Sequence, residues 1–339
     1  MSVPEATVRL SIAEAETLCV DAARAAGASA LAAESLARAT IAAEADGQAS
    51  VGLSHLLDYL DALEAGRIDG HAVPVLTRPA PCIMLSDAGG GIAQLGFDMA
   101  FDELAQVART FGVAIFSQRN AYTCGALGWF VGRLAESGLV GLAATNGPAL
   151  LAGAGTTRPV FCTNPLAFAA PRANGPPLLI DQASSATAFV NIRAAAARGE
   201  AIPEGWALGP DGAPTTDPAQ AMRGALLAFG GTRGANIALM VEVLAAGLSG
   251  ATWSLDAPPF AEGAESPGSG LFVLAISPGL FGEGFEARLG AHLDRLRRDY
   301  RMHVPGEAKA ARRRDSADGG LAVPGAIYRE LVERADSDR

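Results

Sequence analysis

The pattern of apolar residues changes close to residue 71, and this change constrains the fold more than any other feature of the chain. Before it, Ala- and Leu-rich segments predict three helices, and the first of them begins with a capping box from Ser11 to Glu14. The three segments are 11–27, 29–46 and 50–65. The Pro- and Gly-rich stretch 71–91 interrupts this helical pattern and is a candidate domain boundary.

Beyond that stretch, short apolar runs alternate with amphipathic segments. The apolar runs predict strands at 113–117, 139–144, 165–170, 178–180 and 271–276. The amphipathic segments predict helices at 98–111, 125–137, 218–227, 235–248, 284–300 and 325–334. We therefore expect a mixed α and β protein in which a helical N-terminal part packs against a sheet-containing middle.

Charge and rare residues exclude several classes of function. The 339 residues include 26 basic and 36 acidic ones, and a net charge of −10 argues against binding to nucleic acid. The run Arg312-Arg313-Arg314 is expected to be a solvated loop. Lys309 is the only lysine, so no phosphate-binding loop of the G-x-x-x-x-G-K-[ST] type can form. The four cysteines are widely spaced, which favours neither a metal site nor a disulfide scaffold.

The chain lacks the sequence features of a secreted or membrane protein. The first ten residues contain no apolar segment of the kind that signal peptides carry. The long uncharged stretch 139–157 contains a proline and four glycines and would make a poor membrane span. The expectation is a cytoplasmic protein without membrane contact.

An ordinary dinucleotide-binding fold is not expected. The segment 153–158 has the first two glycines of G-x-G-x-x-G, but Arg158 stands where the third belongs. Neither this segment nor Gly89-Gly90-Gly91 follows a predicted strand and opens a helix, as the Rossmann motif requires.

Five polar clusters, four of which contain Gly or Pro, end the apolar runs of the middle part. They are 120–125, 145–147, 162–165, 181–185 and 229–234. Loops held by rigid strands are where ligands usually bind. Taken singly, each cluster is more typical of a turn, whereas the set as a whole predicts a binding site.

Together with the segments 205–208 and 211–218, the Gly230–Gly234 cluster resembles the malate/L-lactate dehydrogenase family that lacks a Rossmann domain. Further matches are 47–50 ahead of Tyr59, 163–165, 181–185 and 305–307. The family includes ureidoglycolate and sulfolactate dehydrogenases and reductases of piperideine- and pyrroline-2-carboxylate, and the resemblance covers nearly the whole chain.

The resemblance implies an α+β subunit whose nicotinamide-binding fold is built mainly from antiparallel sheet. It implies three parts: 1–75 in the substrate and dimer domain, 76–280 binding the cofactor, and 281–339 packing back on the N-terminal part. It further implies a homodimer with NAD or NADP bound near the subunit contact. The implied cofactor contacts are Asn146, Gly147, Asp181, Gln182, Ala183, Arg233, Pro305 and Gly306.

Arg233 stands where relatives usually carry lysine, so the positive charge for a phosphate is kept and bidentate geometry is added. A surface arginine after a Gly-Gly turn is the alternative interpretation. The choice between NAD and NADP stays open, because no ribose-reading acidic residue can be identified without a Rossmann unit.

At the catalytic positions the chain departs from the family pattern. Relatives carry Ser-His-Gly in the third helix, where this chain has Ser50-Val51-Gly52. Relatives carry Asn-His-Phe-Gly where this chain has 122–125. Two histidines that could shuttle a proton are therefore Val51 and Thr123 here.

His55 stands at the position of a family arginine, one helical turn after Val51, so both side chains project from one helix face. We expect it to donate a proton to a carbonyl or to bind a substrate carboxylate, with Asp181 as its carboxylate partner. A histidine with a satisfied ring, in the core or on the helix surface, is the alternative. The expected catalytic residues are His55, Thr123 and Asp181, and the expected substrate contacts are Ser50, Tyr59, Tyr122, Thr163 and Asn164.

Three functions fit these residues; we expect the first, and the other two are alternatives. The first is a nicotinamide-dependent oxidoreductase that moves hydride to or from C2 of a small 2-oxo or 2-hydroxy carboxylic acid. The second is a reductase of a cyclic 2-imino acid, because a protonated imine needs less help from an enzyme acid and tolerates the loss of two histidines better. The third is a relative that binds the cofactor and has lost its activity.

Overall fold

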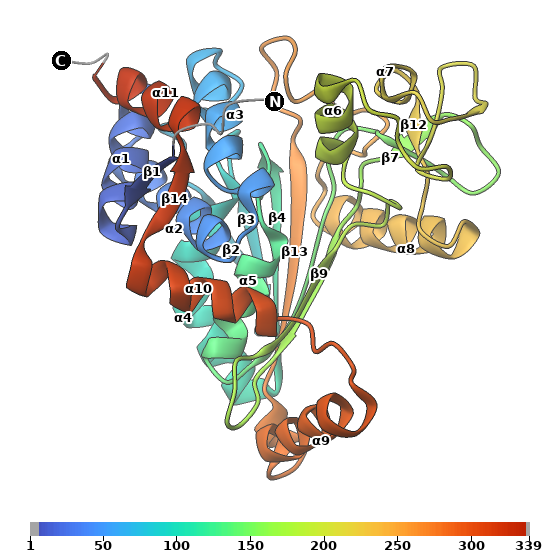
Figure 1. Ribbon diagram of the computed structural model, residues 1–339. Helices are drawn as coiled ribbons and strands as arrows, with labels where there is room; N and C mark the ends of the chain where they lie inside the picture. Colours follow the sequence, from blue (N-terminus) through green and yellow to red (C-terminus); the bar gives the residue numbers. More distant parts are fainter. Residues whose placement is uncertain (1–6, 337–339) are drawn as a thin grey trace.

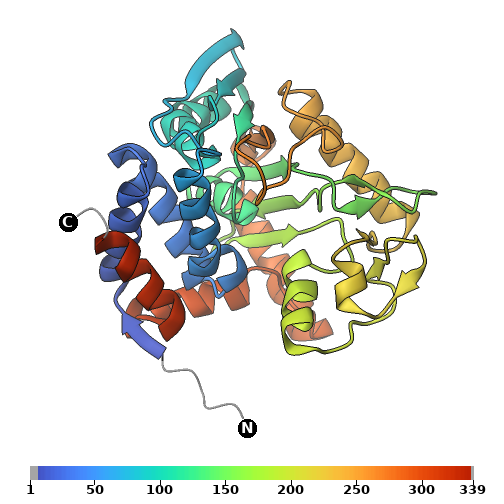
Figure 2. The ribbon, with the colours of Figure 1, turned by 90° about the horizontal axis from the view of Figure 1, so that it is seen from above.

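The computed structural model (Figure 1) describes residues 7–336, which form a helical group, a large sheet and a lobe of short strands. Seen from above, the helices of the two chain ends lie on one side and the lobe lies on the other, with the sheet strands between them (Figure 2). The predicted α+β class is confirmed.

The helical group is built from both ends of the chain. Its N-terminal elements are β1 (Thr7–Leu10), α1 (Ile12–Ala25), α2 (Ala30–Ala45), the 3-10 turn η1 (Ala49–Val51) and α3 (Leu53–Glu64). Its C-terminal elements are α10 (Glu307–Gly319), β14 (Leu321–Pro324) and α11 (Gly325–Asp336). Strand β1 pairs antiparallel with β14, and Leu331 of α11 is fully buried in the same core as Leu56 and Leu60 of α3. The predicted capping box at Ser11 is present.

The large sheet has seven strands. In spatial order they are β2 (Val75–Ala80), β3 (Ile83–Asp87), β4 (Val113–Ala121), β13 (Ser269–Ile276), β5 (Val140–Thr145), β8 (Leu166–Ala170) and β9 (Leu178–Gln182). Strands β3 and β4 run parallel, and the other neighbours run antiparallel. The sheet is thus unlike the parallel sheet of a Rossmann domain.

Side chains of β13 alternate between the two faces of the sheet, and both faces are covered. Leu271, Val273 and Ala275 face α4 (Ala93–Phe111) and α5 (Leu127–Glu136). Phe272 and Leu274 face α8 (Thr232–Glu242) and the π-helical turn η2 (Val243–Gly247). A strand this apolar on both faces can only lie inside the protein, which explains its central position.

The lobe of short strands lies beyond β9. Its five-stranded sheet has the order β11 (Pro214–Thr215), β10 (Ala207–Leu208), β12 (Ala225–Leu226), β6 (Leu151–Ala152) and β7 (Pro159–Phe161). Helices α6 (Phe189–Arg198) and α7 (Pro218–Ala221) cover it. The helix predicted at 218–227 is wrong beyond Ala221, because the chain turns there and enters β12, which pairs with β10 and β6.

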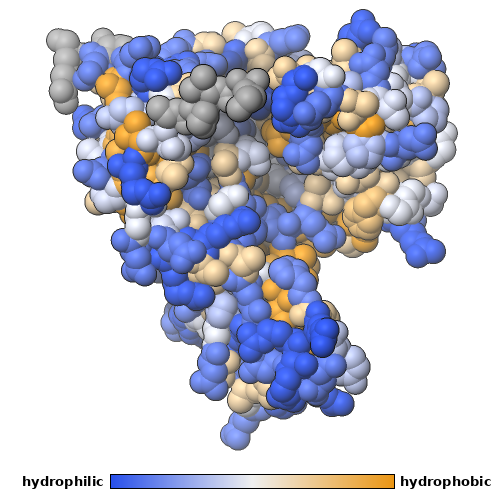
Figure 3. Space-filling view, viewed as in Figure 1, coloured by the Kyte–Doolittle hydropathy of each residue, from blue (hydrophilic) through white to orange (hydrophobic). Residues whose placement is uncertain are grey.

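After β13 the chain forms the 3-10 turn η3 (Pro278–Leu280) and α9 (Phe285–Tyr300), which projects from the body in Figure 1. The projecting part is mostly hydrophilic on the face shown in Figure 3. It is anchored where the Ala173 N–H donates to Glu286 O at 3.0 Å and where Gly290 packs on Ala173.

The arginine run near the C-terminus and the character of the helices can also be compared with the expected structure. The loop predicted at Arg312-Arg313-Arg314 is wrong, because this run lies inside α10. Arg313 there pairs with Asp46 and Glu136. Across residues 7–336 no helix has the length and apolar character needed to cross a membrane.

Candidate active site

Tyr59 links α3 to the loop that follows β4. The phenol is 2% exposed, accepts a hydrogen bond from Gln94 Nε2 at 3.1 Å and donates to Thr123 O at 3.3 Å. Gln94 also donates to Cys124 O at 3.0 Å. Burial strongly raises the pKa of Tyr59, so the phenol stays neutral. Its hydroxyl therefore holds the 122–125 loop against the helical group.

His55 lies one turn before Tyr59, on the same side of α3. Its Nδ1 lies 2.8 Å from Asp58 Oδ2, and its ring meets the Tyr59 ring edge-on with 5.0 Å between centroids. Burial raises the pKa of Asp58, but the hydrogen bond and charge of His55 outweigh it and leave that pKa below its ordinary value. The expected pairing of His55 with Asp181 is wrong, since Asp58 takes that place.

Asp181 is the second-last residue of β9 and faces the start of α5. Its Oδ2 accepts the Gly128 N–H at 3.0 Å, lies 3.5 Å from Gln48 Nε2 and lies 3.7 Å from Lys309 Nζ. A carboxylate at a helix N-terminus is stabilised by the unpaired amides there. The amine of Lys309 is buried, and within the described residues it meets no hydrogen-bond acceptor at normal distance.

Lys309 and Gln48 were not among the predicted site residues. Lys309 is 128 positions from Asp181, and Gln48 is 133 positions from it, so no local pattern could have paired them. The single-lysine composition was the one signal that pointed at Lys309.

Asn146 and Asn164 meet at a buried carboxylate. Asn146 follows β5, and Asn164 lies between β7 and β8 with the uncommon backbone angle φ of 37°. Glu242 of α8 accepts from Asn164 Nδ2 at 2.7 Å and from Asn146 Nδ2 at 3.5 Å. Both asparagines and Glu242 are buried. Ser184 Oγ donates to Asn164 O at 2.7 Å, which ties the 181–185 cluster to the same place.

The ring of Phe260 lies against Gly147 and Tyr122. A Cβ added to Gly147 would lie 2.8 Å from Phe260 Cζ and 3.3 Å from Cys162 Sγ. The Tyr122 hydroxyl donates to Phe260 O at 3.0 Å, and the two rings meet edge-on. Phe260 also packs against the helical group. The loop that carries Phe260 therefore contacts both the helical group and the sheet edge.

The other predicted residues are exposed or half-buried. Arg233 is exposed in the first turn of α8, after Gly230 and Gly231, which both have positive φ. Ser50 is exposed on η1, Gln182 is exposed at the end of β9, and Ala183 and Thr163 are half-buried. Pro305 O accepts from the Leu179 N–H, and a Cβ on Gly306 would lie 2.8 Å from Pro177 O, so only glycine fits there.

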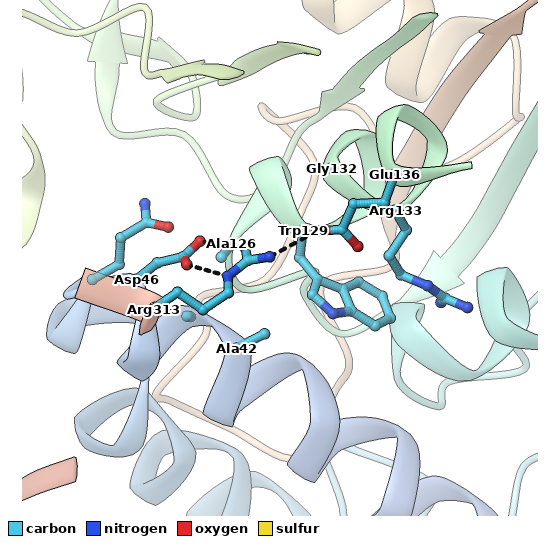
Figure 4. Close-up of a pocket in the computed structure, with 10 residues that line it drawn as sticks. Ala42, Asp46, Ala126, Trp129, Gly132, Arg133, Glu136 and Arg313 are labelled. Carbon is cyan, nitrogen blue, oxygen red and sulfur yellow. Dashed lines mark hydrogen bonds and ion pairs between the residues drawn. The ribbon is translucent and has the colours of Figure 1, made fainter. Parts of the chain in front are cut away.

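Two cavities lie beside α10. One, of about 110 Å³, is lined by Gln48, Trp129, Arg133 and also Arg313, which Figure 4 shows between Asp46 and Glu136. The other, of about 350 Å³, is lined by Leu179, Gly306 and Lys309. Within residues 7–336 no three His, Cys, Asp or Glu side chains come together as a metal site would need.

The chain is similar to known proteins over nearly its whole length. A family model described as malate/L-lactate dehydrogenase matches residues 10–332. A Delta(1)-pyrroline-2-carboxylate reductase of Ancylobacter novellus is 38% identical over 330 residues, which are 96% of each chain. A (2R)-3-sulfolactate dehydrogenase (NADP(+)) of Chromohalobacter salexigens is 38% identical over 95% of this chain and 96% of its own.

Among solved structures, a delta1-piperideine-2-carboxylate reductase from Pseudomonas syringae pv. tomato superimposes with a TM-score of 0.93 and 33% identity. The superposition covers 97% of this chain and 100% of the other.

Proposed function

The chain belongs to the malate/L-lactate dehydrogenase family, and from this premise we propose that it reduces a small cyclic 2-imino carboxylic acid at C2 with NADPH or NADH. Members of the family are dehydrogenases and reductases, so the chain is an enzyme. Support for an imine substrate comes from its relatives of 35% to 38% identity, several of which are named pyrroline- or piperideine-2-carboxylate reductases.

The observation that carries this proposal is the absence of an enzyme acid at two positions. Val51 and Thr123 replace the family histidines, and the Tyr59 hydroxyl is directed to Thr123 O inside the protein. A ketone must gain a proton on oxygen as hydride reaches carbon, whereas a protonated imine already carries its proton. Replacement of the two histidines should therefore slow imine reduction less than ketone reduction.

The chain's residues fit a nicotinamide dinucleotide. Arg233 is an exposed cation in the first turn of the eleven-residue helix α8, where backbone N–H groups also favour a phosphate. Asn164 Oδ1 is buried and, among the described residues, has no donor, so it suits a ligand N–H. When bound, the reduced cofactor supplies the hydride. Gly147 and Asn146 would lie beside the nicotinamide, with Asp181, Gln182, Ala183, Pro305 and Gly306 completing the site.

The substrate needs an anchor for its carboxylate, and His55 is our candidate. With Nδ1 facing Asp58, its Nε2 is the ring nitrogen available to a ligand. Ser50, Thr163 and Tyr122 would border the same substrate. Asp181 would take part in catalysis through the charge that it holds at the start of α5.

A second candidate function is reduction of a 2-oxo acid or oxidation of a 2-hydroxy acid. The 38% identical sulfolactate dehydrogenase favours it. In this case His55 would donate the proton to the substrate oxygen, and its Asp58 partner would stabilise the charged ring.

Turnover assays separate these functions. The purified protein is mixed with NADPH or NADH, and the nicotinamide absorbance is followed with piperideine-2-carboxylate, pyrroline-2-carboxylate, pyruvate and oxaloacetate. We expect the imino acids to be reduced with the higher kcat/KM. Faster reduction of the oxo acids would favour the second function. Altered cofactor fluorescence without turnover of any acid would identify an inactive relative and contradict both.

We further propose that the enzyme is a cytoplasmic homodimer. Four unpaired cysteines suit a reducing compartment. Leu239, Met240 and Val243 of α8 and η2, with the neighbouring Trp253, are 43% to 50% exposed, and apolar side chains gathered on one face are typical of subunit contacts. Sedimentation analysis is expected to give twice the mass of 34.5 kDa, and a monomer at micromolar concentration would contradict it. The division into parts 1–75, 76–280 and 281–339 stays a prediction.

A further inference from the structure

Glu242 is a buried acid that neither the proposed chemistry nor the family resemblance uses. It is 4% exposed and ends α8, at the point where the helix passes into the π-helical turn η2. An ionised side chain at such depth is retained only when donors surround it. Turns of π-helix occur often at functional sites, where they re-aim side chains.

Four donors converge on this carboxylate. Oε1 accepts the Ser254 N–H at 2.7 Å and Asn146 Nδ2 at 3.5 Å. Oε2 accepts Asn164 Nδ2 at 2.7 Å and Ser254 Oγ at 2.7 Å. The Cys162 N–H donates in turn to Ser254 Oγ at 3.1 Å, which favours the hydroxyl as a donor to Glu242. An ionised carboxylate is the one side chain of this size that only accepts hydrogen bonds.

These donors come from three separate loops. Asn146 follows β5, Asn164 precedes β8, and Ser254 lies in the loop between η2 and β13. Asn146 Oδ1 accepts the Gly270 N–H at 2.8 Å, so the first loop is also tied to β13. Gly270 lets η2 approach, because a Cβ there would lie 2.0 Å from Ala245 O. One carboxylate thus joins the loops that carry Gly147 and Thr163.

Glu242 also sets the orientation of the Asn164 amide. Asn164 Nδ2 donates to Glu242 and to Ala238 O at 2.8 Å, which uses both of its N–H groups. Oδ1 must then face the other way, where it is buried and meets no donor among the described residues. An unpaired acceptor at this depth is costly, and a ligand N–H would satisfy it.

We propose that Glu242 is a positioning residue for the nicotinamide end of the cofactor site. It acts through Asn146 and Asn164 and keeps their loops in the binding arrangement before the cofactor arrives. This role rests on the proposed function, because it assumes that a nicotinamide binds beside these loops.

The variant Glu242→Gln tests the proposal. Glutamine keeps the size of the side chain, but its NH2 group must face two of the four donors, whichever way the amide is turned. We expect faster amide hydrogen exchange at 146–147, 162–164 and 252–254, with α1 unchanged. We also expect the KM for the cofactor to rise about tenfold, the effect of one lost hydrogen bond to a charged group. The matched control is Glu204→Gln, an exposed glutamate.

A second variant keeps the test decisive if Glu242→Gln does not fold. Ser254→Ala removes one donor to Glu242 and the acceptor for the Cys162 N–H, and it should shift exchange and KM in the same direction by less. Unchanged exchange in the three loops would overturn the proposal. So would faster exchange with unchanged KM and kcat, which would mean a structural role only.

The exchange measurement needs no cofactor. If the wild-type protein binds neither NADPH nor NADH, the proposed function fails, and exchange alone then decides whether Glu242 holds the loops.

Discussion

Individual side chains of the candidate site are held in defined places by their neighbours. His55 has the only imidazole placed beside the Tyr59 and Thr123 pair within the described residues, and Asp58 holds its Nδ1. Tyr59 is kept neutral by burial. The site therefore offers one imidazole on the α3 side, and Asp181 with Lys309 forms a separate ion pair on the α5 side.

Replacing His55 by glutamine is expected to distinguish the two candidate reactions. Loss of a carboxylate anchor should lower kcat/KM for an imino acid about tenfold, mainly through KM. Loss of a general acid should lower kcat for an oxo acid by about 10²–10⁴. Steady-state kinetics measure both, and His292→Gln, at an exposed histidine of α9, is the control. Full activity of His55→Gln would remove His55 from the mechanism.

The cysteines are expected to differ sharply in reactivity. Burial raises the pKa of Cys19 and of Cys124 to about 12 and also raises that of Cys162, whereas Cys82 is half-buried. At pH 8 a thiol of pKa about 12 is a thiolate in only about one molecule in 10,000. A chromogenic disulfide reagent should therefore find one fast thiol per chain, and Cys82→Ser should abolish it. Two or more fast thiols would show that a buried cysteine is accessible.

At the scale of elements, α10 is attached in an unusual way. None of its residues is fully buried, so polar contacts hold it. Arg313 donates to Asp46 at 2.8 and 3.0 Å and to Glu136 at 2.7 Å, which ties α10 to α2 and to the end of α5 (Figure 4). Lys309 adds the contact with Asp181. Helix α10 is therefore joined to α2, α5 and β9 mainly through charge.

Replacing Arg313 by glutamine should destabilise the protein, because Asp46 is 6% exposed and would lose its bidentate partner. The expected loss is about 1–2 kcal/mol, less than for a fully buried pair because Arg313 is partly exposed. Chemical denaturation measures it. Arg298→Gln, which breaks an exposed pair with Asp299, should leave the free energy of unfolding nearly unchanged. Equal effects of the two variants would argue against this account of α10.

Two glycines of α5 form a matched pair for testing Asp181. A Cβ at Gly128 would lie 2.8 Å from Asp181 Oδ2, whereas a Cβ at Gly132 would meet nothing within 4 Å. Gly132→Ala should stabilise the protein by about 0.5–1 kcal/mol through helix propensity and leave kcat unchanged. Gly128→Ala should displace Asp181 and lower kcat/KM about tenfold. If both variants kept wild-type kinetics, the position of Asp181 would not matter for turnover.

At the scale of the whole molecule, short-range sequence patterns such as helix caps predicted more of the fold than patterns that extend over many residues. The capping box at Ser11 and the glycine after Phe111 marked helix ends correctly, because caps are short-range chemistry. Helix α10 was missed because it lacks an apolar face. The strands of the lobe were missed because two or three residues are too few to show a period.

In the candidate site, too, the local features were predictable from the sequence and the distant contacts were not. The polar clusters at 145–147, 162–165 and 181–185 were visible as turns at strand ends, and the fold ties them together. The partners that hold them, Glu242 for Asn164 and Lys309 for Asp181, are 78 and 128 positions away. Pairings at that distance depend on the insertion of β13 between β4 and β5, which no local pattern encodes.

The packing of the C-terminal helix α11 against the N-terminal helices can be tested at Leu331. This residue of α11 is fully buried in the core formed with α1 to α3. Leu331→Ala should lower the free energy of unfolding by about 2–5 kcal/mol, through lost burial and a cavity. Leu280→Ala, at a leucine that is 61% exposed, should change it by less than about 0.5 kcal/mol. A small effect at Leu331 would mean that the N-terminal helices are stable without α11.

The pairing of β1 with β14 also affects the order in which the protein can form during synthesis. Thr7 lies opposite Pro324, so this contact closes a loop of almost the entire chain. A ribosome adds about 5–20 residues per second, so the first helices wait for many seconds before their last strand exists. During that time the apolar faces of α1 to α3 lack α11. Nascent chains stalled before residue 321 should therefore bind chaperones through their first helices, although these are made first.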